Sequence, residues 1–449
     1  MVASPESLLA TTHAGVRANE HHRDDDRRPC HALPSARDLR SVQGSYGGRC
    51  DERAIRRRLL PLRKAGEKRL IGEPERPIAS ESTARYGPAA MKPEPFESAF
   101  PETEVQDLRA RLRSTRWPEA LGAGGGIGLE RVRALADRWR ERFDFHACTG
   151  SWNRHRHFRA EVQGLRVHFI HAPRPQAPPV LLLHGWPGSF VELLPVLELL
   201  ANDLSLVVPS IPGFGYSPAM PDLAPPAMAD ALAALMKLLG YERFFVHGGD
   251  VGATVGTWLA RRHPREVRGL HLNYIPGSYA PDPGPGLAPE EEQFLRDAQA
   301  WWERAGAYGH VQRTRPLTLG YALEDSPAAL LAWIAEKFDE WADPASPVAD
   351  DTLLANVSLY WFTRTAYSSV RYYLESARVP HRFAPGERVE PPCGVARFPL
   401  EEPFPPRSYI ERAYDVRRFT QMPRGGHFAA LEQPRLLASD LLAFIRELG

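Results

Sequence analysis

Short apolar runs alternate with helical patterns through the middle of the chain. The runs are typical of buried strands and occupy 179–183, 204–208, 243–247 and 268–273. A helical pattern separates the second run from the third, at 226–240. Buried strands that alternate with helices favour a parallel sheet covered by helices. We therefore expect an α/β fold with a mostly parallel central sheet.

Helical sequence precedes this central region. Between Pro101 and Phe145 the apolar side chains follow a helical period, with Val105, Leu108 and Leu112 on one face. Residues 165–171 then alternate between apolar and polar positions, which is typical of a strand.

A second helical region follows the central strands. A hinge rich in Pro and Gly, 281–286, leads into sequence that we interpret as helices only, to about residue 378. Sheet-like sequence resumes at 416–419, and an amphipathic helix occupies about 432–448. The helices thus interrupt the sheet and predict an inserted lid. The expected order is core, lid and core, over 176–280, 281–378 and 379–449.

Residues 1–90 differ in composition from the rest of the chain. They have more basic than acidic residues and almost no periodic apolar pattern, which is typical of disordered segments. The histidines and aspartates of 21–28 have no fixed ligand spacing, so we interpret them as solvated sequence and not as a metal site. The change in character at Met91 suggests that the natural chain starts there and that 1–90 was assigned in error. Finding 1–90 by N-terminal sequencing of the native protein would reject this hypothesis.

Composition excludes some classes of function. The chain has 449 residues, is 43% hydrophobic and 25% charged, and has a net charge of +1, which gives no reason to expect a nucleic-acid partner. Its four cysteines include no CxxC pair, which favours free thiols in a reducing compartment. No apolar run approaches 18 residues and no signal-peptide pattern opens the chain. We expect a cytoplasmic protein without a membrane span. The sequence does not decide whether the protein forms a homo-oligomer.

The most informative motif is Gly248-Gly249-Asp250-Val251-Gly252, between a predicted strand and a predicted helix. It matches the G-x-nucleophile-x-G elbow of α/β-hydrolases, with a carboxylate in place of the serine hydroxyl. A serine that attacks a saturated carbon forms a stable ether, whereas a carboxylate forms an ester that water can cleave. Asp250 therefore indicates an sp3 electrophile, such as an epoxide or an alkyl halide.

The order nucleophile, acid, histidine predicts the partners of Asp250. The histidine is His427, which follows two glycines after a predicted strand and precedes the last helix. The acid should lie on an earlier loop, where Glu401 and Glu402 are adjacent. We choose Glu401 and keep Glu402 in reserve, since spacing hardly separates them. The acid would orient the imidazole and stabilise its charged form.

Two further sets of residues bear on the reaction. His184-Gly185-Trp186-Pro187 follows an apolar strand, so the N–H groups of Trp186 and Val251 are the natural oxyanion-hole pair. Opening an epoxide produces an alkoxide that needs a proton donor, whereas a halide leaves without one. The lid offers tyrosines as donors, at Tyr308 and at the pair Tyr372-Tyr373.

Taken together, several motifs resemble the microsomal or juvenile-hormone type of epoxide hydrolase. They are His184-Gly185-Trp186-Pro187-Gly188-Ser189, Gly248-Gly249-Asp250, Gln312-x-Thr314-x-Pro316, Asp325-Ser326-Pro327, Asn356-Val357-x-Leu359-Tyr360-Trp361 and Arg424-Gly425-Gly426-His427-Phe428. The likeness runs from about 93 to 448. It includes the family's N-terminal region, here 91–175. From the resemblance we expect this region to wrap around the core domain.

The resemblance implies Asp250 as nucleophile, Glu401 as acid and His427 as the base that activates water. It also implies that Tyr308 and Tyr373 hydrogen-bond the epoxide oxygen, that the substrates are a small apolar epoxide and water, and that no metal or organic cofactor takes part. One departure is Val251, where the family commonly has tryptophan, which would reshape the pocket. Another is the absence of the membrane-anchor helix of vertebrate microsomal members. A haloalkane dehalogenase and a non-catalytic binding protein on this fold stay as alternatives.

Overall fold

The computed structural model describes residues 92–119, 125–220, 224–284 and 286–449. The expectations for 1–90, including a start at Met91, lie outside the described residues. None of the described helices is both long enough and apolar enough to cross a membrane.

Within the described residues, one nine-stranded sheet has the order β1-β2-β3-β5-β4-β6-β7-β8-β9. The pairs from β1 to β5 are antiparallel, and those from β5 through β4 to β9 are parallel. The mostly parallel sheet expected from the sequence is thus confirmed. The strands are β1 (Glu94–Phe96), β2 (His157–Val162), β3 (Leu165–Ala172), β4 (Pro179–Leu183), β5 (Ser205–Pro209), β6 (Phe244–Gly248), β7 (Val267–Leu272), β8 (Val389–Arg397) and β9 (Tyr414–Gln421).

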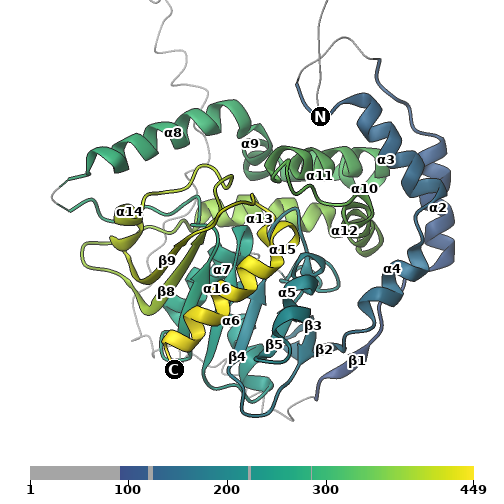
Figure 1. The fold of residues 1–449 in the computed structure, drawn as a ribbon. Coiled ribbons are helices and arrows are strands. Elements are labelled where there is room, and N and C mark those ends of the chain that lie inside the picture. Colours follow the sequence, from purple (N-terminus) through teal and green to yellow (C-terminus); the bar gives the residue numbers. More distant parts are fainter. Residues whose placement is uncertain (1–91, 120–124, 221–223, 285) are drawn as a thin grey trace, which may run out of the picture. The chain divides into compact units, whose positions relative to one another are not determined.

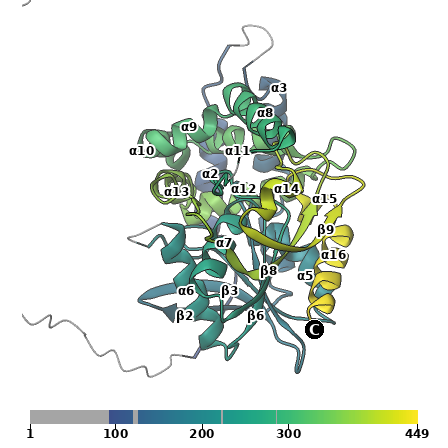
Figure 2. The ribbon, with the colours of Figure 1, turned by 90° about the vertical axis from the view of Figure 1, so that its left-hand side faces the viewer.

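Helices cover both faces of the parallel part of the sheet. Figure 2 shows α6 (Pro225–Leu238) and α7 (Asp250–Arg262) on one side, and α5 (Leu194–Leu200) and α16 (Pro434–Glu447) on the other. Every residue of β5 and of β6 is buried. Burial from both faces explains why these strands are continuous apolar runs in the sequence and do not alternate with polar residues.

A group of helices caps the sheet between β7 and β8 (Figure 1). Proline occupies the first turn of three of them, where its missing N–H costs nothing and its fixed φ favours the helix. The helices are α8 (Pro289–Ala305), α9 (Ala307–Thr314), α10 (Pro316–Asp325), α11 (Pro327–Trp341), α12 (Asp350–Thr363) and α13 (Ala366–Arg378).

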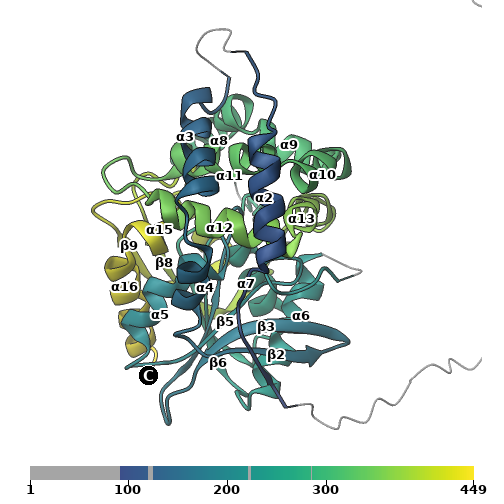
Figure 3. The same cartoon turned by 90° about the vertical axis from the view of Figure 1, so that its right-hand side faces the viewer.

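The N-terminal helices pack against the helices of this cap (Figure 3). They are α2 (Glu102–Arg113), α3 (Leu129–Glu141) and α4 (Phe145–Trp152). The predicted apolar face of α2 is buried, and Trp139 of α3 is buried completely. The Trp139 indole N–H donates to Ser358 Oγ on α12 at 2.8 Å. On the neighbouring turns, Arg138 forms two hydrogen bonds with Asp351.

The structure corrects the expected point at which the sheet resumes after the cap. We placed it at 416–419, but β8 comes first, at Val389–Arg397. Two prolines obscure this strand, since proline cannot donate to a strand ladder and is confined to edges and bulges. The ladder between β8 and β9 shifts register between Val389 and Pro392, and this irregularity accommodates the prolines. β1 and β2 were not expected either.

Candidate active site

Asp250 lies in the sharp turn where β6 passes into α7. Its φ is 47°, in the left-handed region that non-glycine residues rarely adopt. The two flanking glycines are required by close backbone contacts. A Cβ on Gly248 would lie 2.4 Å from the backbone of Gly252, and one on Gly252 would lie 2.3 Å from the Leu183 oxygen. The turn therefore holds its carboxylate above the end of the sheet, as the G-x-D-x-G spacing predicts.

The Asp250 carboxylate receives backbone hydrogen bonds from the loop that follows β4 and from its own turn. The Trp186 N–H donates to Asp250 Oδ1 at 2.8 Å, and the Val251 N–H also bonds the carboxylate. Burial raises the pKa of Asp250, while His427 and the two N–H groups lower it. The predicted pair of N–H donors thus meets at the Asp250 carboxylate.

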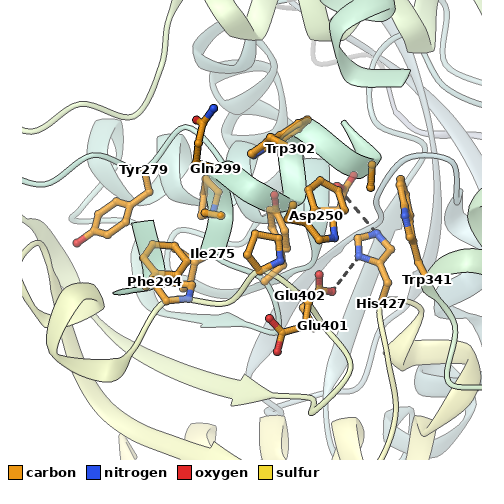
Figure 4. A pocket seen from close by; sticks show the side chains of 18 of the residues that line it. Asp250, Ile275, Tyr279, Phe294, Gln299, Trp302, Trp341, Glu401, Glu402 and His427 are labelled. Atoms are coloured by element: carbon orange, nitrogen blue, oxygen red, sulfur yellow. Dashed lines mark hydrogen bonds and ion pairs between the residues drawn. The ribbon is translucent and has the colours of Figure 1, made fainter. Parts of the chain in front are cut away.

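His427 joins this carboxylate to an acid (Figure 4). Its Nδ1 lies 2.9 Å from Glu401 Oε2, and its Nε2 lies 4.0 Å from Asp250 Oδ2. Glu401 is buried, whereas the Glu402 side chain is 57% exposed and pairs with Arg397 at 3.8 Å. The hydrogen bond to His427 is therefore made by Glu401 and not by Glu402.

The charge state of His427 depends on the carboxylates around it. Burial lowers the pKa of the imidazole, but Glu401 first, then Asp250 and Glu192, outweigh burial and raise the pKa to about 9. With three carboxylates close by, the imidazole is charged at neutral pH.

Two phenols face this group from the cap. Tyr308 on α9 and Tyr373 on α13 are joined by a side-chain hydrogen bond. Their rings pack on Trp186, with centroid distances of 5.6 and 5.5 Å. Burial raises the pKa of both phenols, and the charge of Asp250 raises it further, so both stay protonated donors. Tyr372 packs on Phe214 and also lines a cavity that reaches Asp250.

Two large cavities reach Asp250. One, of about 430 Å³, extends under α8. Its walls include Tyr274 and Trp302, together with Asp250, Glu401 and His427 (Figure 4). The other, of about 800 Å³, extends toward α13 and includes Val251 and Tyr373 in its wall. Most of the side chains that line the first cavity near Asp250 are aromatic or aliphatic.

The loop that supplies the Trp186 N–H is fixed by α12. Asn356 Nδ2 donates to the Pro187 carbonyl at 2.6 Å, and the Tyr360 hydroxyl donates to the Gly188 carbonyl at 2.6 Å. Ser189 Oγ donates to Asn356 Oδ1 at 2.7 Å. Our sequence interpretation noted these residues as motif members but assigned them no part in the site.

The sequence interpretation also missed Glu192. It lies in a short 3-10 helix, Phe190–Leu193, and lines a small cavity beside Asp250 and His427. Its signal was a single carboxylate within the otherwise apolar stretch from Phe190 to Leu197. Such a residue is unlike the others in a segment that must be buried. Among the described residues, no group of three or more His, Cys, Asp or Glu is arranged to hold a metal ion.

A nucleophile elbow on a parallel sheet, with a histidine after a later strand, defines the class: an α/β-hydrolase. Comparison with known proteins agrees. A model described as "alpha/beta hydrolase fold" matches residues 178–318, and one described as "Epoxide hydrolase N terminus" matches residues 93–193.

Individual relatives narrow the class. Epoxide hydrolase 1 of Oryctolagus cuniculus is 33% identical over 78% of this chain and 88% of its own length. The Aspergillus niger epoxide hydrolase structure has a TM-score of 0.73 at 32% identity, covering 80% of this chain and 97% of that one. Juvenile hormone epoxide hydrolase of Bombyx mori has a TM-score of 0.69, also at 32% identity, covering 80% and 94%. The chain belongs to the epoxide hydrolase family.

Proposed function

We propose that this protein hydrolyses an apolar epoxide to a vicinal diol through a covalent ester on Asp250. The observation that carries the proposal is the position of the Asp250 carboxylate. It lies between two backbone N–H donors and His427, below the two buried phenols. The aromatic lining of both cavities supports an apolar substrate.

In the first half-reaction, a carboxylate oxygen of Asp250 attacks one epoxide carbon and the carbon–oxygen bond of the ring breaks. The departing oxygen takes a proton from Tyr308 or Tyr373. Because their pKa values are raised, both phenols hold a proton to give at neutral pH. The product of this step is a hydroxyalkyl ester and one tyrosinate.

In the second half-reaction, His427 takes a proton from water, which attacks the ester carbonyl. The N–H groups of Trp186 and Val251 then stabilise the oxyanion that forms on Asp250 itself. Of the two protons of the water, one finishes on the diol oxygen and the other restores the tyrosine. Atoms and charge are balanced without another reactant.

Ester formation also prepares the base. In the free protein the negative charge of Asp250 helps to raise the pKa of His427 to about 9. Esterification removes that charge, so the pKa of His427 falls, its proton passes to the solvent and the neutral imidazole becomes more populated. His427 takes up a proton from the solvent again when the Asp250 carboxylate is released. Ester formation therefore shifts His427 toward its basic form, although Glu401 continues to raise its pKa.

Labelled water tests the ester directly. Styrene oxide is the probe, and the protein is used in excess in 18O-water so that each site turns over once. The hydroxyl added in that turnover comes from Asp250 and should be unlabelled, while the label enters the carboxylate. A labelled diol in the first turnover rejects the ester mechanism.

Two controls separate the rival functions. A bromoalkane substrate that releases bromide, while styrene oxide gives no diol, would favour a dehalogenase. Asp250→Ala should abolish diol formation, and surviving activity would move the nucleophile elsewhere. Tyr308→Phe and Tyr373→Phe should each leave some activity because the partner can donate, whereas the double variant should lose far more.

A further inference from the structure

We propose that Glu192 positions the water molecule that hydrolyses the Asp250 ester. The inference rests on the proposed function and adds a residue to its second half-reaction. It starts from a third cavity, which is much smaller than the two cavities described above. This cavity has a volume of about 20 Å³ and is lined by Glu192, Asp250, Gly185, Asn273 and His427.

The size of this cavity fits one water molecule. A site needs roughly 10–15 Å³ of such space, together with two to four polar partners, to hold a water. The wall offers the Glu192 carboxylate, the His427 imidazole and the Asn273 amide. An epoxide with its substituents could not enter so small a space, so the cavity is suited to water and not to the organic substrate.

The distance between His427 and Asp250 leaves room for the same molecule. Their nearest atoms, Nε2 and Oδ2, are 4.0 Å apart, which is longer than a direct hydrogen bond. A polar gap of this length is where a bridging water is expected. A water there can donate one proton toward His427 Nε2 and turn a lone pair toward the Asp250 carbonyl carbon. Its second proton then needs an acceptor.

Glu192 is built to be that acceptor. The Gly185 N–H donates to Glu192 Oε1 at 2.9 Å, which fixes the carboxylate. Its other oxygen, Oε2, has no hydrogen-bond partner among the described residues. Gly188 makes room for this oxygen, since a Cβ on Gly188 would lie 1.8 Å from it. One oxygen is therefore anchored to the loop of the oxyanion hole, and the other remains available to the water.

The charges around Glu192 agree with this assignment. The pKa of Glu192 is raised to about 7 as the net result of several effects. Burial raises it most and Asp250 raises it further, whereas the Gly185 N–H and His427 lower it. When Asp250 becomes an ester its repulsion of Glu192 disappears, and the smaller charge of His427 acts in the opposite direction, so Glu192, with a pKa of about 7, keeps an ionised fraction at neutral pH. An ionised carboxylate is an acceptor only, so it orients the water while His427 takes the proton.

The test separates the two half-reactions. Wild-type protein and Glu192→Gln are mixed with styrene oxide and quenched on the millisecond scale, and the ester is measured by intact-protein mass. The glutamine oxygen can still accept from Gly185, but its NH₂ group replaces the acceptor with a donor and misdirects the water. We expect ester formation at close to the wild-type rate, ester hydrolysis slowed about 10- to 100-fold, and accumulation of the ester.

A matched control is Glu198→Gln, which changes an exposed glutamate on the following helix, α5. Both rates should stay at the wild-type values in this variant. Glu192→Asp is the second test variant, in case the glutamine variant does not fold. It keeps the charge but withdraws it from the cavity, so it should also slow hydrolysis and not ester formation.

Three outcomes overturn the proposal: equal slowing of both steps, slowing of ester formation alone, or no effect on either step. Equal slowing would mean that Glu192 only supports the loop through Gly185. Failure of the proposed function is distinct, because then the wild-type protein itself forms no ester.

Discussion

Two buried acid–histidine pairs of similar geometry have opposite surroundings. Glu401 lies 2.9 Å from His427 Nδ1, and Asp440 lies 3.1 Å from His271 Nε2. The difference is in the second nitrogen of each histidine. In His427 it faces Asp250 across a gap, whereas in His271 it meets the Nδ1 of His247 at 3.0 Å.

The acids differ in the same way. Asp440 also accepts hydrogen bonds from Arg418 and Thr420, so its oxygens are occupied by side chains that hold α16 to the sheet. Glu401 has His427 as its hydrogen-bonded side chain and lines a cavity with it. We propose that the Glu401–His427 pair can act on a substrate because the remaining nitrogen of His427 faces a cavity, whereas that of His271 is bonded to His247. The following predictions test this contrast, from the largest effect to the smallest.

Replacement of the histidine should give the largest difference between the pairs. His427→Gln should lower turnover on the order of 10⁴-fold or more while the ester still forms, because only the second half-reaction needs the base. Rapid quench with mass spectrometry measures both. His271→Gln, measured on the folded fraction, is the control and should keep its rate. Equal losses of turnover in both variants would remove the contrast.

Replacement of the second acid should affect stability instead. Asp440→Ala leaves Arg418 and His271 without their partner and should cost about 3 kcal/mol in the free energy of unfolding. Urea titration measures this cost. The folded variant should turn over styrene oxide at the wild-type rate. An unchanged urea midpoint would show that the buried pair does not stabilise the fold.

The two pairs should also lose stability at opposite ends of the pH scale. The pKa of Asp440 is lowered to about 2 by His271, Thr420 and Arg418 against the effect of burial, so its contribution is present above pH 4 and is lost as the pH falls toward 2. The pKa of His427 is raised to about 9, so its contribution is present below pH 6.5 and is lost as the pH rises through 9.

Urea unfolding of wild type, Asp440→Asn and His427→Gln at a series of pH values measures these contributions as differences. The difference between wild type and the Asp440 variant should shrink on the acid side only. The difference for the His427 variant should shrink on the alkaline side only. The reverse assignment would contradict the charge states given above.

The smallest effect is expected next to Glu401, the proposed acid. Glu402→Gln changes a half-exposed side chain 3.8 Å from Arg397, and exposed pairs contribute little, about 0–1 kcal/mol. Turnover should be unchanged, whereas Glu401→Gln should lose most of it. A large loss in the Glu402 variant would return the reserve candidate to the first place.

The sequence predicted those parts of the fold in which burial requires a simple pattern of apolar residues. Strands covered on both faces, such as β5 and β6, are uninterrupted apolar runs and were found. β8 was missed because its prolines are tolerated at a register shift that only its neighbour β9 reveals. The elbow could be predicted because close backbone contacts at Gly248 and Gly252 force a local signature.

Other parts of the site have no such local signature. The side chains of adjacent residues on a loop can point in different directions. The sequence alone therefore could not decide whether Glu401 or Glu402 contacts His427. The meeting of Tyr308 with Tyr373 depends on how α9 packs against α13, far apart in the chain. The lid sequence offered Tyr308 and the pair Tyr372-Tyr373, the family resemblance selected Tyr308 and Tyr373, and their roles remain predictions. Glu192 was missed because its place beside Asp250 and His427 depends on segments that are distant in the chain.

The hydrogen bond between Trp139 and Ser358 has a consequence for local unfolding. It joins α3 to α12, and α12 in turn holds the loop that presents the Trp186 amide. These segments should open together as one cooperative unit. The exchange rate of the Trp186 amide hydrogen would then report whether the N-terminal helices, remote in sequence, are docked.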